Sequence, residues 1–170
     1  MKPTALEGAD VVLRVIERAD LDELHRIVQT PEVARWWNPR TRDEVERWLA
    51  DEDVIRWTIW VEDRVAGKVQ AYEDGGDEYR HAGIDVFLDP AVHGRGLGQD
   101  AVRTVARWLL DERGHHRVIV DPAHANERAI CSYEAVGFRP VGVMRRYWFD
   151  HTTGHWADGL LMDLLAGELR

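Results

Sequence analysis

The chain has 170 residues, 45% of them hydrophobic and 31% charged, and a formal net charge of −9. This length fits one domain over residues 1–170, and the composition excludes a disordered chain. An acidic surface repels a nucleic-acid backbone and attracts cations, although moderate acidity also simply aids solubility. The lone Cys131 cannot form an internal disulfide, no apolar run is long enough to span a bilayer, and no secretory signal is apparent. We therefore expect a cytoplasmic protein that binds neither nucleic acid nor membrane.

The first half of the chain predicts one strand, two helices and three further strands. Residues 11–16 are rich in β-branched side chains, which favour a strand. Asp20 and Thr41 are each followed three residues later by Glu, the pattern of a capping box that opens a helix. The further strands are expected at 54–62, 65–73 and 81–88, with turns around 63–64 and 75–77.

The second half predicts a helix, a strand, a helix and two closing strands. Apolar residues at helical spacing indicate a helix over 97–112. Asn126 can cap a second helix that Gly137 closes. The strands are expected at 117–121, 141–149 and 155–165. This order predicts an α/β (α+β) fold: a mostly antiparallel mixed sheet with a central β-α-β crossover and flanking helices.

The most informative stretch is His-Gly-Arg-Gly-Leu-Gly at 93–98, between a strand and a helix. Glycines let several backbone N–H groups converge, and the helix N-terminus adds partial positive charge, which favours a phosphate or pyrophosphate. The alternative is that the glycines only form a tight turn and bind no ligand. A P-loop lysine is missing, and the third glycine of a dinucleotide-binding turn would fall at Gln99, so a dinucleotide enzyme is a weak second choice.

This stretch resembles the coenzyme motif of the GCN5-related N-acetyltransferase (GNAT) superfamily. That motif has Gln or Arg, two residues, Gly, any residue, then Gly or Ala, at the helix that holds the coenzyme A pyrophosphate. Gly96 and Gly98 match, whereas His93 replaces the Gln or Arg. A second motif of the superfamily is matched from Asn126 through Tyr133 to Gly137-Phe138. The resemblance implies the GNAT fold and an enzyme that uses acetyl-CoA.

The resemblance also implies which residues contact the coenzyme. Tyr133 is placed to donate a proton to the coenzyme A sulfur as general acid, although its spacing also fits plain packing. Asn126 is a helix cap or, in addition, a contact of the pantetheine arm. The coenzyme-binding residues are expected to be Val86, Leu88, His93, Gly94, Arg95, Gly96, Leu97, Gly98, Asn126, Ala129 and Tyr133.

An ammonium acceptor must lose a proton before it attacks the thioester. Asp85 and Asp121 are the candidate bases, because each lies in a predicted strand beside the crossover. Asp85 interrupts an apolar strand, where burying a carboxylate costs free energy unless the group is paired or functional. Either acid also fits a solvated strand end or a cap. The expected catalytic residues are therefore Tyr133, from the resemblance, and Asp121 and Asp85, from their positions in the predicted strands.

Within the superfamily, the chain is similar to the aminoglycoside 6′-N-acetyltransferases. The features are Trp36-Trp37 after the first helix, Gly83-Ile84-Asp85 before the glycine-rich stretch, and Val120-Asp121-Pro122. They imply a small cationic amine as substrate, an aminoglycoside antibiotic acetylated at its 6′-amine, bound by Trp36, Trp37, Asp85 and Asp121.

Some features leave other acceptors open. With 8 Trp in the chain, most must be structural, and Arg145-Arg146-Tyr147-Trp148 matches nothing in that group. The alternatives are an acetyltransferase for a protein N-terminus, a lysine or another small amine, and a non-catalytic acyl-CoA-binding module. His115-His116 lacks the spacing of metal ligands, so no metal is expected. The resemblance leaves a homodimer possible.

Overall fold

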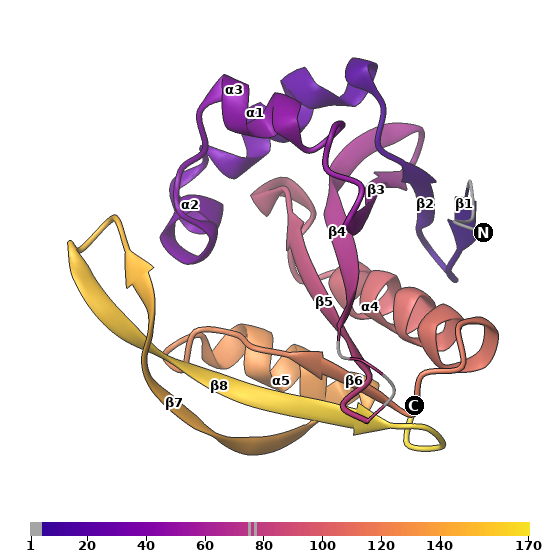
Figure 1. Cartoon of the computed structure of the whole chain (residues 1–170). Coiled ribbons are helices and arrows are strands. Elements are labelled where there is room, and N and C mark those ends of the chain that lie inside the picture. The colour runs from indigo at the N-terminus through magenta and orange to yellow at the C-terminus, as the bar shows by residue number, and fades with distance from the viewer. Residues whose placement is uncertain (1–4, 75, 77) are drawn as a thin grey trace.

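The structure is a computed structural model that describes residues 5–74, 76 and 78–170. These residues form one sheet of eight strands in the order β1-β2-β3-β4-β5-β6-β8-β7 (Figure 1). The strands are β1 (Ala5–Glu7), β2 (Val12–Val15), β3 (Val54–Val61), β4 (Arg64–Asp74), β5 (His81–Leu88), β6 (Arg117–Val120), β7 (Arg139–Asp150) and β8 (His155–Leu165). The helices and helical turns are η1 (Arg18–Asp20), α1 (Leu21–Val28), α2 (Pro31–Trp37), α3 (Arg42–Arg47), η2 (Pro90–Val92), α4 (Leu97–Arg107), η3 (Trp108–Glu112) and α5 (Glu127–Val136).

The sheet is antiparallel except where β5 meets β6, so the predicted mixed sheet with one β-α-β crossover is confirmed. The parallel pair is short: Ala82 faces Val118 and Gly83 faces Ile119. β5 continues beyond this pairing to Leu88, and in Figure 1 it diverges from β6. The last five residues of β5 therefore lack a sheet partner on that edge, which leaves room for a ligand between the two strands.

Two apolar clusters hold the layers together. The larger one packs α4 and α5 on the sheet, and the expected stripe of α4 is buried there, with Trp108 meeting Trp57 edge-to-face at 5.5 Å. The smaller one packs α1, α2 and α3 against the sheet, where Phe87 of β5 is buried and Val65 of β4 is partly buried. Burial of these faces supplies most of the stability, since short helices are marginal alone.

The N-terminal segment is anchored to α4 by a buried carboxylate. Asp100 accepts hydrogen bonds from the backbone N–H groups of Ala9, Asp10 and Val11, at 3.0, 2.7 and 3.1 Å. A buried carboxylate is tolerated when several donors satisfy it, and this one fixes β2 beside the crossover helix.

Some local predictions need correction. The Thr41 capping box is confirmed, but the Asp20 side chain does not cap α1; it accepts from the Glu17 N–H and from the Thr58 hydroxyl instead. Helix α2 and strand β1 were not predicted, because each is too short to show a clear hydrophobic period. The predicted helix over 97–112 is α-helical only to Arg107 and ends in the π-helical turn η3.

Two smaller points complete the fold. Of the turn expected at 75–77, Gly75 and Asp77 lie outside the described residues. No helix in the described part of the chain is both long and apolar enough to cross a bilayer.

Candidate functional site

The glycine-rich loop between η2 and α4 exposes its backbone to open space. Gly94 and Gly96 have φ of +80° and +77°, the left-handed region that side chains with a Cβ rarely adopt. A Cβ added at either glycine would meet no atom within 4 Å. Gly96 is the N-cap of α4, whose first N–H groups are unpaired within the helix. The glycines therefore leave the loop backbone open at the start of α4, and an anion-binding role for it stays a prediction.

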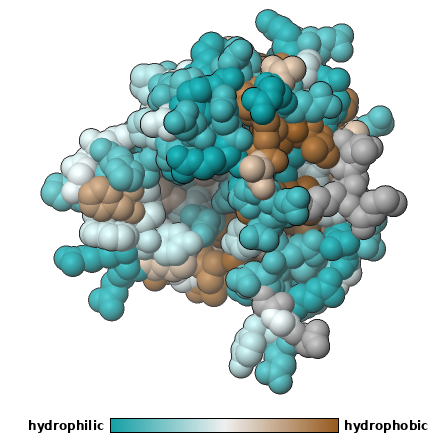
Figure 2. Space-filling model, turned by 45° about the horizontal axis from the view of Figure 1, so that its top comes forward, coloured by the Kyte–Doolittle hydropathy of each residue, from teal (hydrophilic) through white to brown (hydrophobic). Residues whose placement is uncertain are grey.

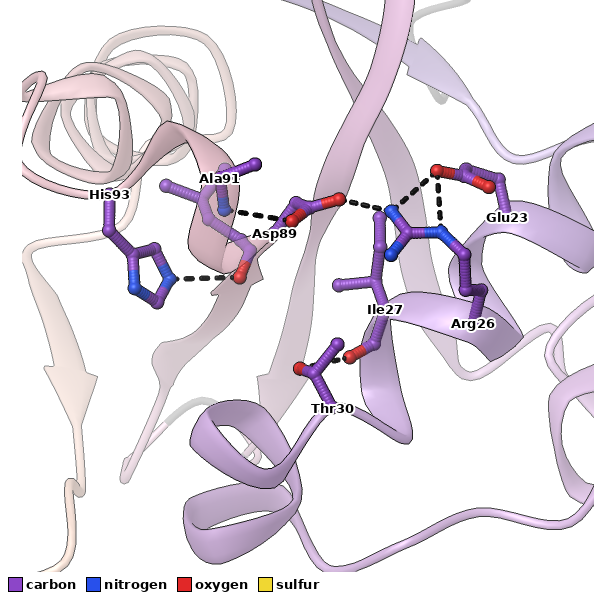
Figure 3. A network of polar contacts seen from close by, with 8 residues as sticks. Glu23, Arg26, Ile27, Thr30, Asp89, Ala91 and His93 are labelled. Carbon is purple, nitrogen blue, oxygen red and sulfur yellow. Dashed lines mark hydrogen bonds and ion pairs between the residues drawn. The ribbon is translucent and has the colours of Figure 1, made fainter.

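The start of this loop is tied to α1 by charged groups (Figure 3). Asp89 accepts a hydrogen bond from the Ala91 N–H at 2.9 Å and forms an ion pair with Arg26 of α1. Arg26 also binds Glu23 one turn earlier, at 2.6 Å. The turn that leads into the glycines is therefore fixed from both sides.

A cavity of about 580 Å³ opens between this loop, the end of β5, α2 and the first turns of α5. Figure 2 shows a hollow in the molecular surface with hydrophilic and hydrophobic parts in its walls. Most of the predicted coenzyme residues line the cavity: Val86, Leu88, His93, Gly94, Gly96, Leu97, Gly98, Asn126 and Ala129. Asn126 caps α5, accepting from the Ala129 N–H at 3.2 Å.

Two predicted coenzyme residues do not line this cavity. The Arg95 side chain pairs with Glu62 at 2.6 Å and lines a second cavity on the β3–β4 side of the loop. Tyr133 is buried deeper on α5, with 8% of its surface exposed. For Arg95, only the backbone remains available to the main cavity.

Both ring nitrogens of His93 bond to protein groups at the cavity wall. Its Nε2–H donates to the Leu88 carbonyl at 2.9 Å, which leaves Nδ1 to accept from the Arg128 guanidinium at 3.0 Å. Burial is the main cause that lowers the pKa of His93, and the Arg128 charge lowers it further. His93 is therefore neutral near pH 7 and holds Arg128 at the cavity wall. Sequence reasoning missed Arg128, although a cation in the first turn of a helix opposes the helix dipole and is itself a signal.

The two predicted carboxylates lie close enough to influence each other. Burial raises the pKa of Asp85, and the Asp121 charge raises it further, while a hydrogen bond from Gln70 opposes the shift. A carboxylate with a raised pKa is a stronger base. Asp121 follows the end of β6 and accepts a hydrogen bond from the Tyr147 hydroxyl.

Tyr133 lies close enough to the same two carboxylates for their charges to act on its hydroxyl. Burial raises the pKa of its hydroxyl above the ordinary value, and Asp85 and Asp121 raise it further. It therefore stays protonated at physiological pH and holds a proton that it can donate. Its ring also packs edge-on against Phe138 at 5.8 Å, so the packing role and the proton-donor role are compatible.

Two more tyrosines complete the cluster, and the sequence did not point to them. Tyr72 faces Gly83 across β4 and β5, where a Cβ would come within 2.1 Å of its ring. Tyr147 lies in the irregular part of β7 beside Gly159, where a Cβ would come within 2.7 Å of its ring. Both rings depend on a glycine opposite them. The register that reveals these pairs is not visible in the sequence.

The tryptophan pair divides between two places. The Trp37 indole N–H donates to the Val86 carbonyl at 3.1 Å, and its ring meets Phe87 at 5.0 Å, so it braces β5. Trp36 lines the cavity with the Arg35 guanidinium 4.5 Å from its ring centroid. Both tryptophans border the cavity, but only Trp37 is tied to the strand that carries Asp85.

No group of three or more His, Cys, Asp or Glu side chains within the described ranges is arranged to hold a metal ion. Buried His115 instead pairs with Glu73 of β4 at 2.7 Å.

Comparison with known proteins identifies the family of the chain. Residues 10–139 match the family model described as the acetyltransferase (GNAT) domain. The aminoglycoside N(6′)-acetyltransferase type 1 of Klebsiella pneumoniae is 28% identical over 153 residues, covering 79% of this chain and 76% of the relative. The spermidine N(1)-acetyltransferase of Escherichia coli K12 is 23% identical over 146 residues, covering 82% and 78%.

A solved structure of the aminoglycoside enzyme AAC(6′)-Ib, in complex with paromomycin and acetyl-CoA, superposes with a TM-score of 0.76. It is 25% identical, and the match covers 92% of this chain and 94% of that one. Since the family model spans most of the chain, the chain belongs to the GNAT family and is an acetyl-CoA-dependent N-acetyltransferase.

Proposed function

We propose that this enzyme acetylates the 6′-amine of an aminoglycoside by direct transfer from acetyl-CoA in a ternary complex. The observation that carries this proposal is the pair of carboxylates, Asp85 and Asp121, whose charges act on each other and on three tyrosines; Asp85 directly precedes Val86 of the cavity wall. Such a site attracts an acceptor with several ammonium groups. Similarity to aminoglycoside acetyltransferases supports the same acceptor.

The residues of the loop suit the coenzyme. The open space over Gly94 and Gly96 can receive a pyrophosphate on backbone N–H groups, and Arg128 adds a positive charge at the wall. Asn126 and Ala129 line the same cavity on the α5 side. When bound, acetyl-CoA supplies an activated thioester, and the chain's part is to orient it beside the acceptor amine.

The proton transfers are assigned to groups in the carboxylate–tyrosine cluster. Asp85, whose pKa is raised, takes the proton that the attacking ammonium must lose. Tyr133 holds a proton at its hydroxyl oxygen and can donate it to the departing sulfur. Asp121, held by Tyr147, and the Trp36 ring bind further ammonium groups of the acceptor.

A polyamine is the second candidate acceptor, because a spermidine acetyltransferase is a relative over a similar share of the chain. The same carboxylates suit both substrates, whose shared feature is several positive charges. With an aminoglycoside as acceptor, the enzyme would act in the cytoplasm, where acetyl-CoA is made, and would confer antibiotic resistance.

Thiol release from acetyl-CoA tests the aminoglycoside proposal. We expect turnover with kanamycin and tobramycin, and none with paromomycin, which has a hydroxyl in place of the 6′-amine. Paromomycin should instead compete with kanamycin, because it keeps the other ammonium groups. Equal turnover with all three would place the acetylated amine elsewhere, and turnover with none would exclude aminoglycosides as acceptors.

A further inference from the structure

Lys68 of β4 is a fully buried lysine in a cage of aromatic rings. Its exposed surface is 0%, and it is one of two lysines in the sequence, with Lys2. Its Nζ lies 4.0 Å from the Trp48 ring centroid, 4.6 Å from that of Trp37 and 5.6 Å from that of Phe87. Ring faces attract a cation and offset part of the cost of burying it.

One amide connects this lysine to the carboxylate cluster. Lys68 Nζ donates to Gln70 Oε1 at 2.6 Å, and Gln70 Nε2 donates to Asp85 Oδ2 at 2.8 Å. Gln70 stands opposite Asp85 in the register of β4 and β5, and Lys68 is two residues away on the same face. An ammonium has only donors, so it holds the amide with its oxygen toward Lys68 and its NH₂ toward Asp85.

We propose that Lys68 is a positioning residue for acetyl transfer, which acts through Gln70 to orient Asp85 and to keep it ionised. This inference rests on the proposed function, because it takes Asp85 as the base. With the ammonium in place, Asp85 can only accept the amide hydrogen bond, which fixes its Oδ2 and favours its ionised form. With an uncharged side chain at position 68, the amide can reverse and favour a protonated Asp85.

The charges of Arg40, Arg56 and Asp121 act on the Lys68–Gln70–Asp85 hydrogen-bond chain. Burial lowers the pKa of Lys68 well below its ordinary value, Arg56 of β3 and Arg40 lower it further, and Asp85 raises it. Around Asp85, the Asp121 charge opposes ionisation, whereas Lys68 and Arg56 favour it.

Three tyrosine hydroxyls lie near Asp85 and Asp121, those of Tyr72, Tyr133 and Tyr147. They stay protonated, because burial raises their pKa and the two carboxylates raise it further. Lys68 is joined to Asp85 by two hydrogen bonds through Gln70.

A structural role alone would not require a lysine. Methionine has a similar length and no desolvation cost, and replacing buried charged groups by apolar ones of the same volume is often neutral or stabilising. A lysine in this cage is explained if its charge acts on Asp85.

The first test is the pH dependence of Lys68→Met. The ratio of wild-type to variant kcat/KM cancels the titration of the acceptor amine. We expect this ratio to be about tenfold at the acidic end of the profile and less than about threefold at the alkaline end, because loss of the ammonium raises the pKa of Asp85 by about one unit. A ratio that is constant with pH would mean a structural role and would overturn the proposal.

Gln70→Leu is the matched variant, because it interrupts the same chain of hydrogen bonds and leaves Lys68 in its cage. It should show the same acid-side loss, and the double variant should lose no more than either single one, since contacting residues in one chain are not additive. Additive losses would contradict transmission through Gln70.

A second test does not depend on activity or on a variant of Lys68. With only Lys2 and Lys68 in the sequence, ¹³C-labelled lysine gives two Cε resonances, whose titration reports each pKa. Asp85→Asn should lower the pKa of Lys68 and leave Lys2 unchanged. An unchanged Lys68 titration would refute the coupling, even if Asp85→Asn is inactive and the base assignment stands. A shifted titration with full activity of Asp85→Asn would refute the base, and with it the positioning role.

Discussion

Gly96→Val is expected to reduce acetyl-CoA binding at least about 100-fold. A β-branched residue at φ +77° is strained by about 1–3 kcal/mol, so the loop moves from its present path. The added methyl groups would also occupy the open space over the backbone N–H groups that we assign to the pyrophosphate. Calorimetric titration with coenzyme A measures the loss directly.

Two controls separate this effect from general damage. Gly154 in the turn between β7 and β8 has φ +72° and open space around it, as Gly96 has, so Gly154→Val carries a similar strain at a position that does not line the cavity. It should lose stability but keep coenzyme binding. Tyr133→Phe should keep binding within about twofold and lower kcat about 100-fold, the usual scale for loss of a general acid. Wild-type binding by Gly96→Val would remove the glycine loop from the coenzyme site.

Asp85→Asn is expected to lower kcat/KM by about 100- to 1,000-fold, because the amide cannot accept the proton of the attacking ammonium. The stability of the same variant should increase, although its activity falls. Burial raises the pKa of Asp85, so the folded state disfavours its ionised form, and stability is lost as the pH rises through that pKa. The neutral amide removes this penalty, so the variant should melt at a higher temperature than the wild type at pH 8 and at nearly the same temperature at pH 4.

Asp121→Asn is the matched control for this result. The Asp121 charge raises the pKa of Asp85, so its removal should shift the acidic limb of kcat/KM to lower pH. The larger effect should be on KM, because Asp121 is assigned to binding the acceptor. If Asp121→Asn lost turnover and Asp85→Asn kept it, the roles of the two acids would be reversed.

The parts of the fold that local patterns encode could be predicted from the sequence. The glycine loop, the cap at Asn126 and the stripe of α4 each depend on residues a few positions apart, and each is found in the structure. Their order along the chain was enough to predict the crossover that forms the cavity. Helix α2 was missed, since its seven residues carry the tryptophan pair but no clear period.

The rest of the site depends on pairings between distant strands. Gln70 meets Asp85 because of the β4–β5 register, and Tyr147 reaches Asp121 because β7 is irregular between Met144 and Trp148. Arg146 sits in that irregular segment with φ +51° and donates its N–H to Asp158. Without the strand register, the sequence does not show that Lys68 and Gln70 differ from other residues of a strand.

Kanamycin and spermidine, compared as acceptors under the same conditions, test the proposed substrate most directly. We expect kcat/KM to be at least about tenfold higher for kanamycin, because rigid rings can engage Asp121 and Trp36 together while the 6′-amine meets Asp85. The product should carry its acetyl group on the 6′-nitrogen. A higher kcat/KM for spermidine, or acetylation of kanamycin at another amine, would contradict the proposed function.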